Sequence, residues 1–496
     1  MSLNNNDIQV FFIGKPQWEA GWPYLGYDSE PLKNSILEHL NKRFPEVKFN
    51  YSDIITNYDE KYMEQAKEKI SKAEGIIIFT IGHYGNPDIV DVGKELIQTG
   101  KPVILANIVY AGDHTFTKLY SILKDQNYPI FPISSKKIED MDTPIEVLSN
   151  LVKIRENKVL VYALESEQMD WSRIMGLLNP ERKNVLKKYP DYIEQIAKMN
   201  KEDSKFYIDL VGKDQAHQWR KDTPRYKENL KSIFDVEMIR GDPEEILKYY
   251  DEVKGSDAKD IAAKWMKDAL KVEPTEKTIV NSAKLYLAFK KILKEKNITF
   301  FTPDCGTLLL CGKMPAYPCM AFFELFNEGV NGICESDMDS TISFILGFYL
   351  TGRPGFVSNH TFHLPDNQIT YMHCVAPRVL YGANGPLANY EILHHGETEI
   401  VGASPSVKYP INEILTTVKI SVLEKKIAIR TGKIVDNPTD KGGCVTKVLV
   451  ETNANEILEN YDWETFGWHR VSFLGDWKEH FQIAAKLLGL EVIQNS

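Results

Sequence analysis

The chain has 496 residues, of which 43% are hydrophobic and 26% are charged. This composition is that of a globular protein, and the length predicts about three domains. Lys and Arg number 59 against 69 Asp and Glu, so the net charge is −10, which disfavours binding to the phosphate backbone of nucleic acids. No apolar run approaches the ~18 residues of a membrane-spanning helix, and the N-terminus lacks the basic region of a signal peptide. We therefore expect a cytoplasmic protein that binds neither nucleic acid nor a membrane.

The first part of the chain alternates between strand-like and helix-like patterns. Predicted strands and helices follow one another at 8–13, 31–44, 47–51, 62–73, 75–81, 89–99 and 102–106. Alternation of this kind predicts βαβ units on a parallel sheet. The strand pattern restarts at 158–164, which places a domain boundary near residue 155. We predict an N-terminal α/β domain over residues 1–155.

The next part of the chain is richer in lysine and in helical patterns. Helices are predicted at 243–250, 257–270 and 276–294, and strands at 206–211, 236–239 and 298–301. These patterns predict a second, central α/β domain over residues 156–355.

The pattern changes again after about residue 360. Segments 417–422, 426–430 and 445–452 alternate apolar and polar residues, which is typical of antiparallel hairpins in a small barrel or sandwich. The chain ends with a predicted helix at 477–488 and a strand at 490–493. The predicted fold class is therefore α/β, with two parallel-sheet α/β domains followed by a mostly antiparallel β domain over residues 356–496.

A group of acidic residues follows a short apolar run at 331–334. Glu335, Asp337 and Asp339 alternate with other residues there. A carboxylate at the end of a parallel strand lies at the edge where open α/β sheets place their ligand sites, which makes Glu335 a functional candidate. The same pattern also suits the start of a helix, because acidic side chains stabilise a helix N-terminus. Topology alone leaves both interpretations open.

Six short motifs occur in order between residues 318 and 374: Pro318-Cys319, Asn327-Glu328-Gly329, Cys334-Glu335-Ser336-Asp337, Leu350-Thr351-Gly352-Arg353-Pro354, Asp366-Asn367 and His373-Cys374. This series resembles the L-fucose isomerase/L-arabinose isomerase superfamily, in particular its fucose isomerase-related branch. The segment 467–473 is similar to the closing histidine motif of that family. The first 300 residues agree only in their α/β pattern.

The resemblance implies a divalent-metal site, usually holding manganese, between the central and C-terminal domains. Glu335 matches the first carboxylate ligand, and His373 and His469 match two histidine ligands. Asn359 stands where the family has its second carboxylate ligand. Oxygen ligands with some imidazole suit Mn²⁺ or Mg²⁺ better than a thiolate site would.

The resemblance also implies an activity, metal-dependent aldose–ketose isomerisation of a small sugar by proton transfer through an enediol. Glu335 is the predicted catalytic residue, but Asn359 cannot act as a general base. Either Glu335 works alone, or Asp337, Asp339 or Asp366 assists. Alternatively, the protein binds sugars without isomerising them, or it is another metal-dependent enediolate enzyme such as a lyase.

Weaker signals concern substrate contacts and assembly. Trp18 and His83 lie on predicted loops after strands, while Asp337 and Trp468 lie close in sequence to predicted ligands. All four are candidate sugar-binding residues. In the resembling family the N-terminal domain of a neighbouring subunit helps to close the site, so we expect a homo-oligomer, commonly a hexamer.

Overall fold

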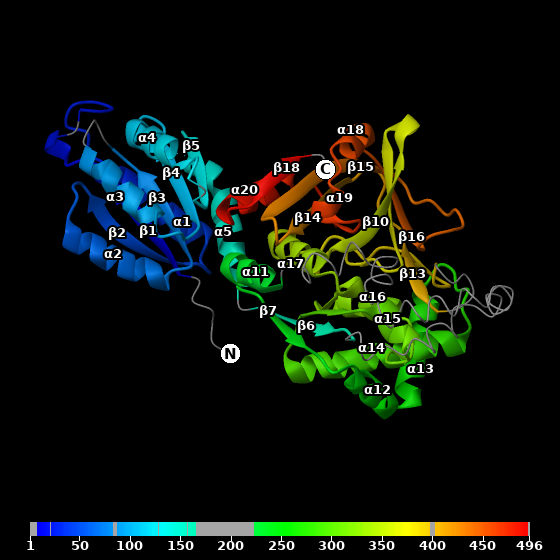
Figure 1. Cartoon of the computed structure of the whole chain (residues 1–496). Coiled ribbons are helices and arrows are strands. Elements are labelled where there is room, and N and C mark those ends of the chain that lie inside the picture. The colour runs from blue at the N-terminus through cyan, green and yellow to red at the C-terminus, as the bar shows by residue number, and fades with distance from the viewer. Residues whose placement is uncertain are drawn as a thin grey trace. The chain divides into compact units, whose positions relative to one another are not determined.

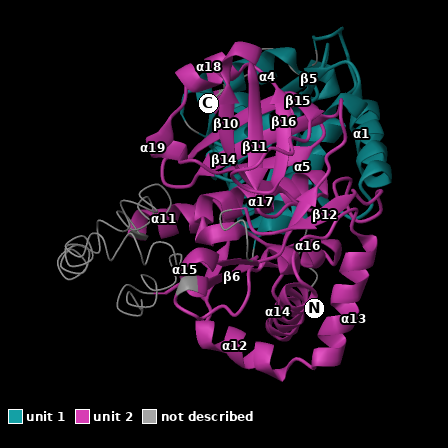
Figure 2. Cartoon of the chain, turned by 90° about the vertical axis from the view of Figure 1, so that its right-hand side faces the viewer, with its two compact units in different colours: residues 1–155, 479–492 teal, residues 156–478, 493–496 magenta. Residues whose placement is uncertain are grey.

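The computed structural model describes residues 7–19, 21–82, 87–126, 128–155, 157–164, 223–396 and 402–494. The chain divides into two compact units (Figure 2). Unit 1 comprises residues 1–155 and 479–492, and unit 2 comprises residues 156–478 and 493–496. The strand predicted at 206–211 lies outside the described residues. Among the helices of the described part, none combines the length and the apolar character that crossing a membrane requires.

Unit 1 contains a five-stranded parallel sheet with the strand order β2-β1-β3-β4-β5 (Figure 1). Its strands are β1 (Asp7–Ile13), β2 (Lys48–Ile55), β3 (Gly75–Thr80), β4 (Val103–Ile108) and β5 (Ile130–Ser135). Every residue of β3 is buried, as its continuous apolar sequence predicts for the centre of a parallel sheet. The parallel α/β fold predicted for this part of the chain is confirmed.

The helices of unit 1 connect these strands: α1 (Glu30–Arg43), α2 (Glu60–Lys72), α3 (Pro87–Ile97), α4 (Asp113–Leu123) and α5 (Asp142–Ile154), with short helices η1 (Gln17–Glu19) and η2 (Ile138–Met141). Asp59 begins α2 by accepting a hydrogen bond from the backbone of Tyr62. Apolar side chains of α2, α3 and α4 pack with those of the sheet in one buried cluster. Near the end of the chain, the sequence boundaries of the units fall inside two elements. Unit 1 includes α20 (Lys478–Leu487) from Glu479 onward and β18 (Glu491–Gln494) as far as Val492.

Unit 2 contains a second parallel sheet with the strand order β7-β6-β8-β9. Its strands are β6 (Lys158–Tyr162), β7 (Glu237–Arg240), β8 (Phe300–Pro303) and β9 (Asn331–Gly332). The helices in this part are α11 (Thr223–Asn229), η4 (Leu230–Phe234), α12 (Pro243–Glu252), α13 (Gly255–Asp268), α14 (Glu276–Lys296), α15 (Cys305–Leu310) and α16 (Cys319–Asn327). The central α/β region is therefore also confirmed.

The segment after β9 leads from the parallel sheet to a long buried helix. It forms the short helix η5 (Cys334–Ser336) and then α17 (Met338–Thr351). Asp337 begins α17 by accepting a hydrogen bond from the backbone of Ser340, and Gly352 ends it in the left-handed conformation, with φ of 65°. Glu335 thus lies at the carboxyl edge of the sheet, as the topology predicts.

The C-terminal part of unit 2 forms a closed barrel of six antiparallel strands. The order β14-β17-β10-β11-β16-β15 is closed by pairing of β14 with β15. The strands are β10 (Phe356–His363), β11 (Gln368–His373), β14 (Ile414–Ser421), β15 (Lys426–Asp436), β16 (Thr446–Glu451) and β17 (Arg470–Leu474). A two-stranded ribbon of β12 (Tyr390–Leu393) and β13 (Ser404–Val407) lies outside this sheet, and the short helices are η6 (Leu364–Asp366), α18 (Ala454–Glu459) and α19 (Trp463–Phe466).

The two faces of the barrel differ in chemistry. The outer face is apolar where α17 covers it, for example where Phe344 packs against Phe473 with ring centroids 6.3 Å apart. The inner face is polar: Thr417 on β14 pairs with Arg430 on β15 and with Ser472 on β17. Directly paired residues point to the same face of a sheet. The barrel therefore encloses polar side chains.

Candidate metal centre

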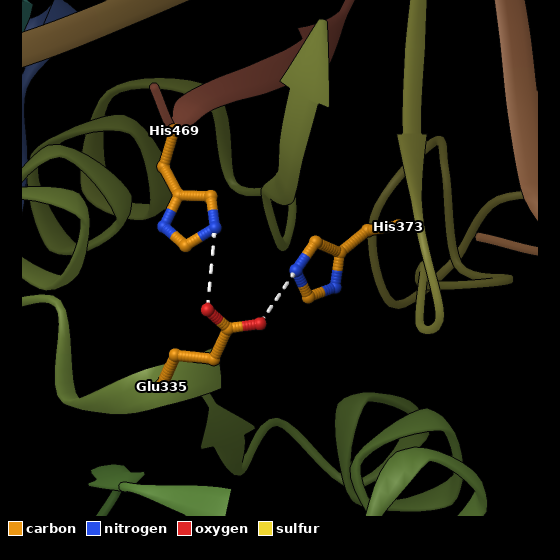
Figure 3. A group of neighbouring side chains, drawn as sticks. All are labelled: Glu335, His373 and His469. Atoms are coloured by element: carbon orange, nitrogen blue, oxygen red, sulfur yellow. Dashed lines mark ion pairs between the residues drawn. The ribbon is translucent and has the colours of Figure 1, made fainter. Parts of the chain in front are cut away.

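Three side chains from distant parts of unit 2 converge on one point (Figure 3). Nε2 of His373 lies 3.3 Å from Oε1 of Glu335, and Nε2 of His469 lies 3.6 Å from Oε2 of the same carboxylate. The two imidazole rings lie 5.6 Å apart. In Figure 3 the carboxylate points toward both rings, and each ring presents one nitrogen to it.

Each of the three residues lies at or within three residues of the end of a strand. Glu335 is the middle residue of η5, three positions after the end of the parallel strand β9, while His373 is the last residue of β11 and His469 immediately precedes β17. His373 and His469 are buried, with 5% and 1% of their surface exposed, whereas 40% of the Glu335 side-chain surface is exposed. The carboxylate is therefore the accessible member of the group.

The backbone at Glu335 has an uncommon conformation. Glu335 has φ of 67° and Ser336 has φ of 54°, both in the left-handed region that favours glycine. Such a conformation costs on the order of 1–3 kcal/mol per residue and concentrates at functional sites. Here it turns the Glu335 side chain back toward the two histidines before α17 begins.

Asp337, itself bound by Lys419, contacts His469 on the side of the ring away from Glu335. Nδ1 of His469 donates a hydrogen bond to Oδ2 of Asp337 at 3.1 Å, because a carboxylate can only accept. The same oxygen accepts from Nζ of Lys419 at 2.6 Å and from Oγ of Ser340 at 2.7 Å. Asp337 holds the proton on Nδ1, so Nε2, which faces Glu335, is the nitrogen that a metal ion would take, as is common for metal-binding histidines.

Electrostatics keep both carboxylates ionised. Burial by itself would raise the pKa of Glu335, but the charge of His469 and the hydrogen bond from His373 outweigh it and lower the pKa to about 2. Burial would likewise raise the pKa of Asp337, but Lys419 and His469 hold it well below its usual range. At neutral pH the group therefore contains an ionised ligand oxygen and an ionised carboxylate that orients His469.

The donor atoms of Glu335, His373 and His469 lie within 4.8 Å of one another, and this group could hold a metal ion. One carboxylate and two imidazoles are ligands that divalent manganese, iron and zinc all accept, so the donor set fits a divalent cation without naming it.

Asn359, the fourth predicted ligand, lies on β10 next to this group. The β10–β17 pairing runs to Ser358 opposite Arg470, and one more step would set Asn359 opposite His469. Oδ1 of Asn359 is buried and has no hydrogen-bond partner within the described part of the chain. A buried oxygen that lacks a donor is suited to a bound cation or to a ligand hydroxyl.

The remaining predicted residues lie in different surroundings. Asp337 is 4% exposed and contacts protein groups only, as described above, and the exposed Asp366 lies in η6. Trp468 is 40% exposed and donates from Nε1 to the carbonyl of His360. Trp18 belongs to unit 1, where it is 81% exposed on η1. His83 lies outside the described residues.

The acidic residue Asp339 is part of the helix α17. It is 6% exposed, and its Oδ1 accepts hydrogen bonds from the hydroxyl of Tyr226 and from the backbone of Val422. Burial raises its pKa to about 6. Its contacts thus connect α17 to α11 and to the end of β14.

Sequence reasoning missed the buried basic residues near the site. Lys419 fixes Asp337, and Arg470 donates from Nη1 to the carbonyls of Gly467 and His469, which shapes the turn that carries His469. Their signal in the sequence is a basic residue at alternate positions of a strand, which is equally typical of a strand facing solvent.

No protein-family model matches the chain, and no curated protein matches it either. The fold and the site therefore define its class only as an α/β protein with a C-terminal barrel and a Glu/His/His group that could hold a metal ion.

Proposed function

We propose that the protein is a metal-dependent aldose–ketose isomerase that acts on a small sugar, with Mn²⁺ or another divalent cation such as Mg²⁺ as its cofactor. The observation that carries the proposal is the convergence of Glu335, His373 and His469 from three separate segments. These are the residues that the resemblance to sugar isomerases assigns as ligands.

The residues of the group have distinct roles in this proposal. A bound divalent cation would polarise the sugar carbonyl and hold the neighbouring hydroxyl. Glu335 is ionised and accessible, so it takes a proton from the carbon next to the carbonyl and returns it to the carbonyl carbon, while the proton of the neighbouring hydroxyl moves to the carbonyl oxygen. Asp337 fixes the tautomer of His469, and Asn359 offers a neutral oxygen to the cation or the sugar.

A second candidate is a sugar-binding protein or another metal-dependent enediolate enzyme. It is favoured because the carboxylates near Glu335 are already hydrogen-bonded to other residues. Asp337 is fully engaged by Lys419, Ser340 and His469, and Asp339 is engaged by its own partners. Glu335, with a pKa of about 2, is a weak general base at neutral pH. Formation of a ketose from an aldose separates the two candidates.

The test is an isomerisation assay on the full chain with Mn²⁺ and a panel of aldopentoses and deoxyhexoses. The isomerase proposal predicts ketose formation by the wild type and a loss of at least about 10²-fold in Glu335→Gln, which keeps the shape of the side chain but removes the base. Ketose formation that Glu335→Gln leaves unchanged would contradict the assignment. Sugar-dependent stabilisation without formation of a ketose from any sugar would support the second candidate.

We also propose that the protein assembles as a homo-oligomer, as hexameric members of the resembling family do. Closed symmetric assemblies are the general expectation for soluble oligomers. Light scattering at micromolar concentration tests this proposal, and a stable monomer would contradict it.

A further inference from the structure

The interior of the barrel buries two arginines whose guanidinium groups the described residues satisfy only in part: Nη1 of Arg470 donates to the carbonyls of Phe466, Gly467 and His469, whereas Arg430 donates to none. Arg430 and Arg470 are 3% and 1% exposed. Nε, Nη1 and Nη2 of Arg430 have no hydrogen-bond partner among the described residues, nor do Nε and Nη2 of Arg470. Within the same described ranges neither guanidinium forms an ion pair with a carboxylate. Five buried nitrogen atoms of the two guanidinium groups therefore lack a hydrogen-bond acceptor among the described residues.

Aromatic contacts show that these groups lie close together. The guanidinium of Arg430 lies 5.3 Å from the ring centroid of Tyr371, although β15 and β11 are not neighbouring strands. Arg470 lies 4.9 Å from the ring of Tyr461, and the ring of His360 lies 6.4 Å from Tyr371 and 5.2 Å from Tyr461. We call Arg430, Arg470 and His360 the arginine cluster.

The cluster carries two positive charges, and no carboxylate of the described residues forms an ion pair with either of them. Nδ1 of His360 and Oγ of Ser358 are also buried without a partner in the part of the chain that the structure describes. Water molecules can supply hydrogen bonds here, but they leave both cations uncompensated.

An isolated charge removed from water is costly unless an opposite charge and hydrogen bonds replace the lost hydration. Guanidinium groups bind phosphate, sulfate and carboxylate through paired N–H donors. We propose that the arginine cluster binds an anionic group of this kind, carried by the same small molecule whose other end lies at Glu335, His373 and His469. This inference rests on the proposed function and narrows the substrate to a sugar with a phosphate, sulfate or carboxylate group.

The position of the cluster supports this link. Arg470 directly follows His469 in the chain. Tyr371, over which Arg430 lies, comes two residues before His373 on β11, so the two side chains point to the same face about 7 Å apart along the strand. This separation is comparable to the length of an open-chain pentose or hexose. One sugar can therefore place its carbonyl end at the metal centre and a terminal anionic group at the arginines.

The first test uses thermal unfolding of the full chain with inorganic phosphate or sulfate, against chloride at constant ionic strength. We expect a saturable rise in melting temperature with both oxyanions in the wild type. Arg430→Met should lose this rise and, in chloride alone, should melt no lower than the wild type, because an unpaired buried charge is removed. Lys433→Met, at an exposed position of the same strand, is the matched control and should keep the rise.

Arg430→Lys tests the same site without removing the charge. It should fold and respond to phosphate at concentrations at least tenfold higher than the wild type, because an ammonium lacks the paired donors. No oxyanion response in the wild type, or an unchanged response in Arg430→Met, would overturn the proposal. So would an Arg430→Met protein that melts below the wild type in chloride.

The second test asks whether the anionic group belongs to the sugar. In the presence of Mn²⁺, an aldopentose 5-phosphate or aldohexose 6-phosphate should half-saturate the stabilisation at a concentration at least tenfold below that of the parent sugar and of inorganic phosphate. Arg430→Met should remove this preference and leave the Mn²⁺ response unchanged. Equal binding of neutral and phosphorylated sugars would overturn the substrate assignment, whereas loss of the Mn²⁺ response in the wild type would instead count against the proposed function.

Discussion

The sheet of unit 1 and the barrel of unit 2 treat buried polar groups differently. In unit 1, the buried Thr80 and Asn107 bond to each other, and Asn107 also bonds to Asp113 at 3.1 Å. In the barrel, Arg430 and Arg470 keep buried donors that no described residue accepts. Satisfied polar groups stabilise a fold, whereas unsatisfied charges destabilise it. Unit 1 also leaves Oγ1 of Thr115, Oγ of Ser149 and Oδ1 of Asp7 buried without a partner among the described residues, but the first two are neutral and Asp7 forms an ion pair with Lys48. The contrast is therefore one of buried charge, and it indicates that the barrel is suited to bind an anion.

The largest effect is expected from the paired cation of the barrel, Lys419. Its ion pair with Asp337 is buried on both sides. Lys419→Met leaves Asp337 without its main counter-charge, so we expect a loss of about 3–5 kcal/mol in the free energy of unfolding. Urea denaturation measures this loss, with Arg430→Met as the matched replacement of an unpaired cation. Equal destabilisation by the two variants would contradict the claim that Lys419 stabilises the fold and Arg430 does not.

A pH-dependent effect is expected from Asp339, whose pKa burial raises from 3.8 to about 6. In the unfolded chain this carboxyl ionises near its ordinary value, but in the folded chain it holds its proton longer. Its contribution to stability therefore falls as the pH rises from about 4 to about 6, by up to about 3 kcal/mol.

Asp339→Asn removes this ionisation while keeping an acceptor for Tyr226. The difference in unfolding free energy between the variant and the wild type should be near zero at pH 4 and should grow in favour of the variant up to pH 7. Chemical denaturation across this range measures it. A difference that is constant with pH would contradict the raised pKa.

A smaller effect is expected at Asn359, the uncharged position beside the metal centre. Asn359→Asp changes the volume little and adds one negative charge next to His469. If about 1.4 kcal/mol of the Coulomb attraction survives desolvation, Mn²⁺ should bind about tenfold more tightly. Calorimetric titration measures the affinity, and Asn460→Asp, at an exposed position, controls for the change in net charge. The same affinity in all three proteins would show that residue 359 lies outside the ligand shell.

Much of the fold could be predicted from hydrophobic periodicity. The apolar run at 75–81 became β3 (Gly75–Thr80), and the helical pattern at 276–294 became α14 (Glu276–Lys296). The alternating segments at 417–422 and 426–430 became the hairpin of β14 and β15. Local patterns suffice here because each strand or helix has to bury one apolar face.

The inner face of the barrel could not be predicted in the same way. Alternation at Thr417, Lys419 and Arg430 indicates a strand with one polar face, and a polar face most often contacts solvent. Only the closing pair β14–β15 and the helix α17 on the apolar side turn the polar face inward. Pairing between distant segments has no local signature, so the arginine cluster was invisible in the sequence.

The candidate metal centre could be predicted from the sequence in part. Strand topology indicated Glu335, because the carboxyl edge of a parallel sheet is a predictable place. His373 and His469 came only from the resemblance to sugar isomerases, since no spacing relates them to Glu335. The support of His469 by Lys419 depends on β14 passing the start of α17, which the sequence alone does not reveal.

The central claim is that Glu335, His373 and His469 hold one divalent cation, and Mn²⁺ titration of the full chain tests it most directly. We predict one tight Mn²⁺ site per chain in the wild type and in His363→Ala, which replaces an exposed histidine of β10. At a hundredfold excess over Kd, that site should add about 2.7 kcal/mol to the stability of both proteins. His469→Ala should lose the tight site and this stabilisation. A His469→Ala protein that binds Mn²⁺ as tightly as the wild type would contradict the account.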